Sequence, residues 1–171
     1  MKPQIYSIGH SNYSLERLLG LLAQHRIEAL ADIRRFAGSR KFPHLNQESL
    51  AAATADAGIE YHWLEALGGR RSTKKGGPAS RNLGLRNESF RNYADYMHTD
   101  AFRRGVEKLL ELAADKRTAI MCAEAVFWRC HRRLVSDFLL ANGIAVRHIM
   151  PSGELHQHTL TSGAKAENGE V

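Results

Sequence analysis

The chain has 171 residues, a formal net charge of +6 at pH 7, and 43% hydrophobic residues. This composition excludes an intrinsically disordered chain and provides enough apolar side chains for one domain with a core. No apolar run approaches the roughly 20 residues that span a bilayer, and the N-terminus lacks the apolar segment of a signal peptide. We therefore expect a cytoplasmic protein with no membrane partner, in which Cys122 and Cys130 are reduced thiols.

Strand-like and helix-like segments alternate along the first part of the chain, which is typical of a parallel sheet with crossover helices. Residues 4–8 predict a first strand, and Ser14 is expected to cap a helix whose leucines recur at helical spacing. Residues 29–33 predict a second strand and residues 59–64 a third. Between these two strands we expect a helix from Asn46 to Asp56, closed by a glycine.

The same alternation continues in the second half of the chain, and the expected elements are helices at about 88–97 and 100–114, a strand at 118–122, a helix at 128–142 and a strand at 144–149. We predict a single three-layer α/β domain over residues 1–150, with a mostly parallel central sheet of about five strands flanked by helices. Such an arrangement is Rossmann-like or flavodoxin-like. From residue 151 the chain is polar and aperiodic, so residues 151–171 are expected to be a mobile C-terminal tail.

Residues 65–87 interrupt this pattern with a long segment that is rich in glycine and in basic residues. A loop of this length inside a compact domain is usually functional or disordered. We predict a lid over residues 69–80 that is mobile without a ligand and closes over it. The candidate lid or nucleic-acid-binding residues are Arg70, Arg71, Lys74, Lys75 and Arg81.

Polar clusters follow three of the expected strands. In parallel α/β sheets, ligands bind at the carboxyl ends of the strands, and right-handed crossovers bring these ends to one rim. We therefore predict one pocket that contains His10, Asp32, Arg34, Cys122, Glu124 and Arg132.

Cys122 ends an expected buried strand, and the short loop after it leads into a helix. The free N–H groups and positive dipole of a helix start favour an anion and lower the pKa of a nearby thiol. The spacing differs from the Cys-x5-Arg loop of cysteine phosphatases, because Arg129 lies seven positions after Cys122. The alternative for Cys122 is a buried strand residue, and Cys130 shares a helix face with Leu134 and Phe138, as a core residue would.

Three further residues are candidates for catalysis. Glu124 directly follows the strand among arginines, which suits either a general acid/base or an ion-pair anchor. Asp32 has the same two interpretations, with Arg34 or Arg132 as its ion-pair partner. His10 follows a glycine at a strand end and is either a general base or a structural residue.

Basic residues gather in or beside these loops, and the net positive charge suits a phosphate-bearing small molecule or a nucleic acid as partner. The helix start near Trp128 would add N–H donors. The alternative is a set of solvated loops with scattered charge. The candidate anion-binding residues are Arg34, Arg129, Arg132, Ser11 and His131, and the aromatic residues available for stacking on bases are Phe36, Phe42, Phe127 and Trp128.

Nitrogen and sulfur ligands for a metal are present in His10, Cys122, Cys130 and His131. No pair of them has zinc-finger spacing, and the adjacent Cys130 and His131 would point to different helix faces. We therefore expect neither a metal nor a cofactor.

Four blocks of the chain resemble the DUF 488 family, a domain of unknown function. They are Ile5-Tyr6-Ser7-Ile8-Gly9-His10-Ser11, Asp32-Ile33-Arg34, Tyr93-Ala94-Asp95-Tyr96-Met97, and Met121-Cys122-Ala123-Glu124 with Cys130-His131-Arg132. The resemblance runs from about residue 4 to 150, and one departure is Ala37, where many members have Pro. It implies a compact α/β domain in which these blocks form one site, and it implies no substrate.

Three hypotheses for the function follow. The first is an enzyme with hydrolase-type chemistry on a phosphate-bearing substrate, with Glu124 as acid/base, His10 assisting it and Cys122 as an optional nucleophile. The second is a non-catalytic nucleic-acid-binding module. The third is a structural or regulatory protein whose motif residues form a buried ion-pair network. The sequence does not determine the substrate or the oligomeric state.

Overall fold

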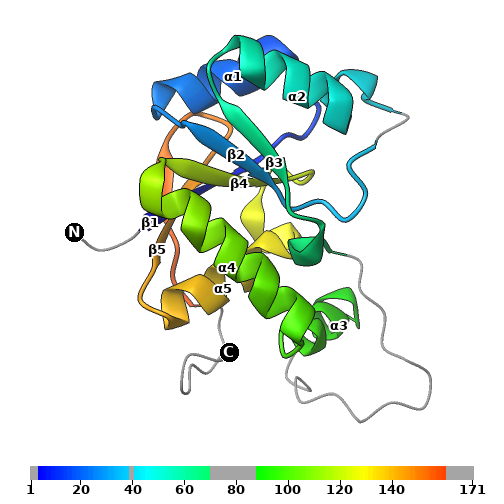
Figure 1. Ribbon diagram of the computed structural model, residues 1–171, viewed down its shortest axis with the longest axis vertical. Coiled ribbons are helices and arrows are strands. Elements are labelled where there is room, and N and C mark those ends of the chain that lie inside the picture. Colours follow the sequence, from blue (N-terminus) through cyan, green and yellow to red (C-terminus); the bar gives the residue numbers. More distant parts are fainter. Residues whose placement is uncertain (1–3, 39–40, 70–87, 161–171) are drawn as a thin grey trace.

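The computed structural model describes residues 4–38, 41–69 and 88–160, which form a six-stranded sheet with helices on both faces (Figure 1). The strand order is β3-β2-β4-β1-β5-β6, and every pairing is parallel except that of β5 with β6. The predicted α/β class and mostly parallel sheet are confirmed, with one strand more than expected. The strands are β1 (Gln4–Gly9), β2 (Ala29–Asp32), β3 (Glu60–Trp63), β4 (Thr118–Cys122), β5 (Ala145–Ile149) and β6 (Leu155–Gln157).

Side chains that alternate along the strands divide the core into two layers. Tyr6 and Ile8 of β1 pack with one pair of helices, whereas Ile5 packs with the other group on the opposite face. The first layer lies under α1 (Leu15–Gln24) and α2 (Gln47–Asp56), and the second lies under α3 (Glu88–Tyr96), α4 (Asp100–Asp115) and α5 (Arg132–Ala141). The sheet with one layer of helices on each face is the three-layer arrangement that the alternating pattern predicts.

The helix that was expected over residues 128–142 begins only at Arg132. A 3-10 turn, η3 (Phe127–Arg129), precedes it, and Cys130 between them has extended backbone angles of φ −136° and ψ 168°. An extended residue breaks the helical hydrogen-bond ladder. Trp128 therefore does not mark a helix start, and the sequence expectation of anion-binding N–H groups there is corrected.

The fold also extends beyond the domain end expected at residue 150. Gly153 has a φ of +88°, which suits the tight turn that sends the chain back along β5 as β6. His158 is buried, and its N–H donates to the carbonyl oxygen of Val146 at 2.8 Å. Residues 151–160 are therefore part of the domain rather than a tail, whereas residues 161–171 lie outside the described residues.

Of the lid predicted over residues 69–80, all but Gly69 lies outside the described residues, together with Arg81 and with the candidate residues Arg70, Arg71, Lys74 and Lys75. Among the helices that are described, none combines the length and the apolar character that crossing a membrane requires.

Gly9, at the end of β1, brings two loops of the site into backbone contact. A side chain there would place its Cβ 1.6 Å from the carbonyl oxygen of Glu124, far inside van der Waals contact. The chain continues the strand pairing past this point, because the N–H of His10 donates to the Cys122 carbonyl at 2.9 Å and that of Ser11 to the Ala123 carbonyl at 2.8 Å. The loop after β1 therefore sets the position of the loop after β4.

Gly9→Ala should destabilise the protein, because the new methyl group has no space unless the loop after β4 moves. The cost expected for such overpacking is about 1–3 kcal/mol. Gly20→Ala is the matched control: Gly20 lies in α1, and no neighbouring atom comes within 4 Å of the place that its new methyl group would occupy, so alanine should stabilise the helix by up to about 1 kcal/mol. Urea denaturation of both variants measures the difference, and equal stabilities would contradict the close packing.

Candidate functional site

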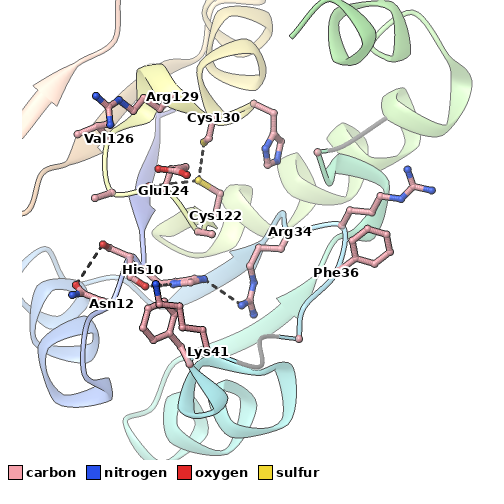
Figure 2. A pocket seen from close by; sticks show the side chains of 18 of the residues that line it. His10, Asn12, Arg34, Phe36, Lys41, Cys122, Glu124, Val126, Arg129 and Cys130 are labelled. Atoms are coloured by element: carbon pink, nitrogen blue, oxygen red, sulfur yellow. Dashed lines mark hydrogen bonds between the residues drawn. The ribbon is translucent and has the colours of Figure 1, made fainter. Parts of the chain in front are cut away.

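A cavity of about 1070 Å³ opens at the carboxyl ends of β1, β2 and β4 (Figure 2). The structure thus brings together the three polar clusters that follow these strands. Seven of the predicted site residues line the cavity, and two, Asp32 and Arg132, are buried behind its wall. The lining residues among them are His10, Ser11, Arg34, Cys122, Glu124, Arg129 and His131.

Asp32 and Arg34 form a buried ion pair, with side chains 0% and 7% exposed. The Arg34 Nε donates to Asp32 Oδ1 at 2.9 Å and Nη2 to Oδ2 at 2.7 Å, while Nη1 donates to the Leu45 carbonyl at 2.9 Å. The Tyr61 hydroxyl also donates to Asp32, and burial together with this carboxylate raises the pKa of Tyr61. The guanidinium of Arg34 is therefore engaged in holding the loop after β2, which differs from the phosphate clamp expected from the sequence.

Asp32→Asn should destabilise the fold strongly, because it leaves the Arg34 guanidinium buried without its counter-charge. Breaking a buried pair in this way costs about 3–5 kcal/mol. Glu65→Gln provides a control on a charged pair in the same region, since Glu65 is 46% exposed and lies 3.9 Å from Arg35. Its effect should stay below about 1 kcal/mol. Thermal and urea denaturation measure both, and a mild effect of Asp32→Asn would mean that the pair contributes little.

His10 lies in the cavity wall with both ring nitrogens engaged. The carbonyl oxygen of Ser11 can only accept, so Nδ1 donates to it at 2.8 Å, and Nε2 accepts from Arg34 Nη1 at 3.3 Å. Burial lowers the pKa of His10, and the charge of Arg34 lowers it further. His10 is thus a neutral ring that links two loops. This arrangement favours a structural role for His10 over a role as general base.

Ser11 and His131 also make contacts within and between the loops of the site. Ser11 has a φ of +45°, and its Oγ lies 3.5 Å from Asn12 Oδ1 at the cavity surface. His131 precedes α5, its Nε2 donates to the Ile33 carbonyl at 2.8 Å, and its ring lies against Tyr93 with 5.0 Å between centroids. His131 therefore ties the loop after β4 to the chain that follows β2.

Cys122 and Cys130 face each other in the cavity wall, with 2.8 Å between their sulfur atoms (Figure 2). Burial alone would raise the pKa of the Cys122 thiol, but the hydrogen bond from Cys130 and the positive charge of Arg132 lower it to about 7. Burial and the hydrogen bond to Cys122 raise the pKa of Cys130 well above its ordinary value. At neutral pH the thiolate and the thiol of Cys122 are therefore both populated, and the negative charge of the pair resides on Cys122 rather than on Cys130.

Arg132 is only 1% exposed and lies beneath these thiols, at the start of α5. Its Nη2 donates to the carbonyl oxygens of Glu124 at 3.0 Å and Ala125 at 3.4 Å, and its Nη1 donates to Ser7 Oγ at 3.3 Å. Its Nε has no hydrogen-bond partner, and no carboxylate pairs with it among the described residues. The sequence analysis places Arg132 among the anion-binding residues of the pocket; in the structure its buried guanidinium shapes the loop after β4 and favours the Cys122 thiolate.

A buried hydrogen-bond chain leads from Arg132, at the start of α5, across β1 and β5 and back to Asp137 of the same helix. Ser7 Oγ contacts His148 Nδ1, His148 Nε2 lies 2.8 Å from His158 Nδ1, and His158 Nε2 lies 2.7 Å from Asp137 Oδ1. Burial lowers the pKa of His148 to about 2, and the charge of Arg132 adds to this effect. With His148 neutral, the chain is satisfied when Ser7 donates to His148, His148 donates to His158, and His158 donates to Asp137.

Sequence reasoning missed this chain. A histidine at an inward position of β5, His148, is the one signal that the sequence offers, because a buried histidine requires partners. Its partners come from β1, from α5 and from the segment after β6, which no local pattern connects. The ring of Phe127 stacks on His148 with 3.7 Å between centroids, so that face of the ring is covered by His148.

Positively charged side chains outnumber negatively charged ones around the mouth of the cavity. The cations among its lining residues are Arg34, Arg35, Lys41 and Arg129, and Glu124 is the one acid among them. Glu124 and Arg129 are exposed, and neither has an ion pair within the described part of the chain. With Arg34 neutralised by Asp32, the described rim keeps a net positive charge.

Two of the four expected stacking residues are exposed near this rim. Phe36 is 63% exposed and Trp128 46%, whereas Phe42 packs against the core. The guanidinium of Arg35 lies 5.4 Å from the Phe36 ring centroid. Among the described residues, no group of three or more His, Cys, Asp or Glu side chains is placed to hold a metal ion.

The reactivity of Cys122 should follow the ionisation of its thiol. Alkylation by iodoacetamide should reach half of its maximal rate near pH 7, because the thiolate is the nucleophile. Cys130→Ala removes the hydrogen bond that lowers the pKa of Cys122, so its profile should shift to higher pH. Mass spectrometry of the labelled peptide measures both rates, and identical profiles, or a wild-type midpoint near that of free cysteine, would contradict the proposed stabilisation.

Comparison with known proteins identifies one family match. A family profile described as "Domain of unknown function DUF488" matches residues 14–139. No curated protein and no solved structure matches the chain. The matched range includes Asp32, Arg34, Cys122, Glu124 and Arg132, as the sequence resemblance implied, and it leaves out β1 with His10 and the segment that carries His148 and His158.

Proposed function

This chain belongs to the DUF488 family, whose description assigns no activity, and we propose that it is an enzyme that attacks a phosphate-bearing substrate with the Cys122 thiolate. One observation carries this proposal. The Cys122 sulfur faces a cavity with a positively charged rim, and a buried guanidinium without a carboxylate partner among the described residues lies beneath it. A nucleophile held between positive groups is suited to an anionic substrate.

The positive rim supports phosphate as the recognised group. Arg35 and Lys41 come from the segment between β2 and η1 (Pro43–Leu45), Arg129 comes from η3 after β4, and guanidinium groups match the geometry of phosphate oxygens. A cavity of about 1070 Å³ is large enough for a nucleotide-sized molecule. The substrate class is therefore a phosphate ester of nucleotide size or a nucleic acid end.

The reaction takes place in two steps. In the first, the Cys122 sulfur bonds to phosphorus, the bond from phosphorus to the leaving oxygen breaks, and the Glu124 carboxyl group donates its proton to that oxygen. In the second, the Glu124 carboxylate accepts a proton from water, the water oxygen bonds to phosphorus, and the bond from sulfur to phosphorus breaks. Glu124 is suited to both transfers because it lines the cavity and is exposed to water.

Protection of Cys122 from alkylation tests the binding step. Inorganic phosphate and nucleoside monophosphates should slow labelling by iodoacetamide, and added salt should weaken this protection. Arg129→Ala should raise the half-protecting phosphate concentration roughly tenfold, the equivalent of one charge-assisted hydrogen bond. Arg104→Ala, an exposed arginine of α4 that does not line the cavity, is the matched control and should leave protection unchanged.

Hydrolysis of p-nitrophenyl phosphate and of nucleotides tests the chemistry. Cys122→Ser should reduce kcat by at least about 10³-fold, and Glu124→Gln should reduce it by roughly 10²- to 10⁴-fold. Phosphorus bound to Cys122 after acid quenching would identify the intermediate. Turnover that is unaffected by Cys122→Ser would overturn the assignment of the nucleophile, and an absence of protection by any phosphate compound would overturn the ligand class.

A second candidate function, binding of single-stranded nucleic acid, is favoured by the exposed Phe36 and Trp128 beside the same rim. A short single-stranded DNA in the protection experiment distinguishes the two. Binding without turnover, with quenching of Trp128 fluorescence and a loss of affinity in Phe36→Ala, would support the binding module. The third hypothesis applies to Asp32 and Arg34, which form a buried ion pair, but it does not extend to the exposed Glu124.

A further inference from the structure

Two cysteines, rather than one, lie at the base of the cavity, and phosphoryl transfer requires only Cys122. Their sulfur atoms come from different parts of the fold, because Cys122 ends β4 whereas Cys130 follows η3. We propose that Cys122 and Cys130 form a reversible oxidation site, in which a small hydroperoxide oxidises Cys122 and Cys130 then closes a disulfide with it. This inference does not rest on the proposed function, because it needs only the two sulfur atoms and access through the cavity.

Cys122 is the sulfur that reacts first. Oxidation by a peroxide requires a thiolate, and the hydrogen bond from Cys130 and the charge of Arg132 favour the thiolate at Cys122 over its buried surroundings. The sulfur is only 2% exposed but lines the cavity, which admits a molecule as small as hydrogen peroxide. In this step the sulfur bonds to one peroxide oxygen, the oxygen–oxygen bond breaks, and the departing hydroxide takes a proton from solvent.

Cys130 is placed to complete the reaction. It keeps its proton at neutral pH, and the 2.8 Å between the two sulfur atoms needs to shorten only to about 2.05 Å for a disulfide. The Cys130 sulfur bonds to the Cys122 sulfur, the sulfur–oxygen bond of the sulfenic acid breaks, and the hydroxyl group leaves with the Cys130 proton as water. An external thiol such as dithiothreitol returns the two electrons and restores both thiols.

The local backbone leaves room for this closure. Cys130 lies between a 3-10 turn and the first residue of α5, and so belongs to neither the sheet nor a regular α-helix. The Cys130 sulfur accepts the backbone N–H of Arg132 at 3.2 Å, which orients it toward Cys122. Disulfide formation removes the negative charge above Arg132 and leaves that buried guanidinium without a charged partner among the described residues. The disulfide form therefore compensates the charge of Arg132 less well than the thiolate form does, and the disulfide should be reduced readily.

The test treats the full reduced chain with hydrogen peroxide at pH 7 and follows its intact mass. In the wild type, the mass should fall by two hydrogen atoms, both free thiols should be lost, and dithiothreitol should restore them. In Cys130→Ser, the mass should instead rise by one oxygen atom, and dimedone should label Cys122. Cys122→Ser is the matched control and should remain unmodified at the same peroxide concentration.

Three outcomes would overturn the proposal. They are further oxidation of Cys122 while Cys130 stays free, disulfides only between chains, and no reaction at peroxide concentrations that leave methionine intact. If Cys130→Ser does not fold, phenylarsine oxide provides a second measurement on the wild type, because one arsenic atom should bridge the two sulfur atoms and block peroxide oxidation. Phosphatase activity measured in parallel keeps the two proposals separate, since an inactive chain can still form the disulfide.

Discussion

The guanidinium of Arg132 is almost completely buried where α5 begins, and the arrangement of the site depends on how its charge is accommodated. A buried cation requires hydrogen-bond acceptors and a compensating charge. The acceptors are the carbonyl oxygens of Glu124 and Ala125, which bend the loop after β4 around the guanidinium, and the hydroxyl of Ser7. The thiolate of Cys122 supplies a compensating charge. The loop conformation and the reactivity of the thiol are therefore two consequences of one buried charge.

Three arginines of the same site have three different roles, and burial together with the partners of each explains the difference. Arg34 is buried and neutralised by the carboxylate of Asp32, and its hydrogen bond to the Leu45 carbonyl connects the end of β2 to η1. Arg132 is buried among carbonyl oxygens and activates a thiol. Arg129 is exposed at the rim, and no ion pair within the described residues neutralises its charge. Counting basic residues overestimates the charge available to a substrate, because the described structure uses two of these three guanidinium groups internally.

The chain from Ser7 through His148 and His158 to Asp137 gives Arg132 a fixed orientation. When each member donates toward Asp137, the Ser7 oxygen is left to accept from Arg132. The proposed hydrolytic and oxidative reactions share this support, since both begin at the Cys122 thiolate. Closure of a disulfide with Cys130 would remove the nucleophile of the first reaction, so an oxidant would reversibly stop the proposed hydrolysis.

The sequence by itself predicts the α/β class, the order of the main elements and the rim at which the polar clusters meet. These features follow from hydrophobic periodicity and from parallel strand direction, which are local or topological properties. It also indicates Cys122 as a candidate thiolate. The sequence also leaves Arg34 and Arg132 open as ion-pair partners of Asp32, and the structure selects Arg34. Other partners of buried groups cannot be predicted in this way, because they are set by the folded surroundings: Cys130 lies against Cys122, and Arg132 turns inward to Ser7.

Periodicity also fails at the C-terminal end, where residues 151–160 have a polar, aperiodic sequence and yet complete the sheet and place His158 in the interior. A polar side chain is buried when a partner can satisfy it, and the partner of His158 is supplied by α5. Only the tertiary structure thus decided which charges are neutralised and which remain at the rim. The physical reason is that desolvation and pairing depend on the three-dimensional surroundings of a group rather than on its sequence neighbours.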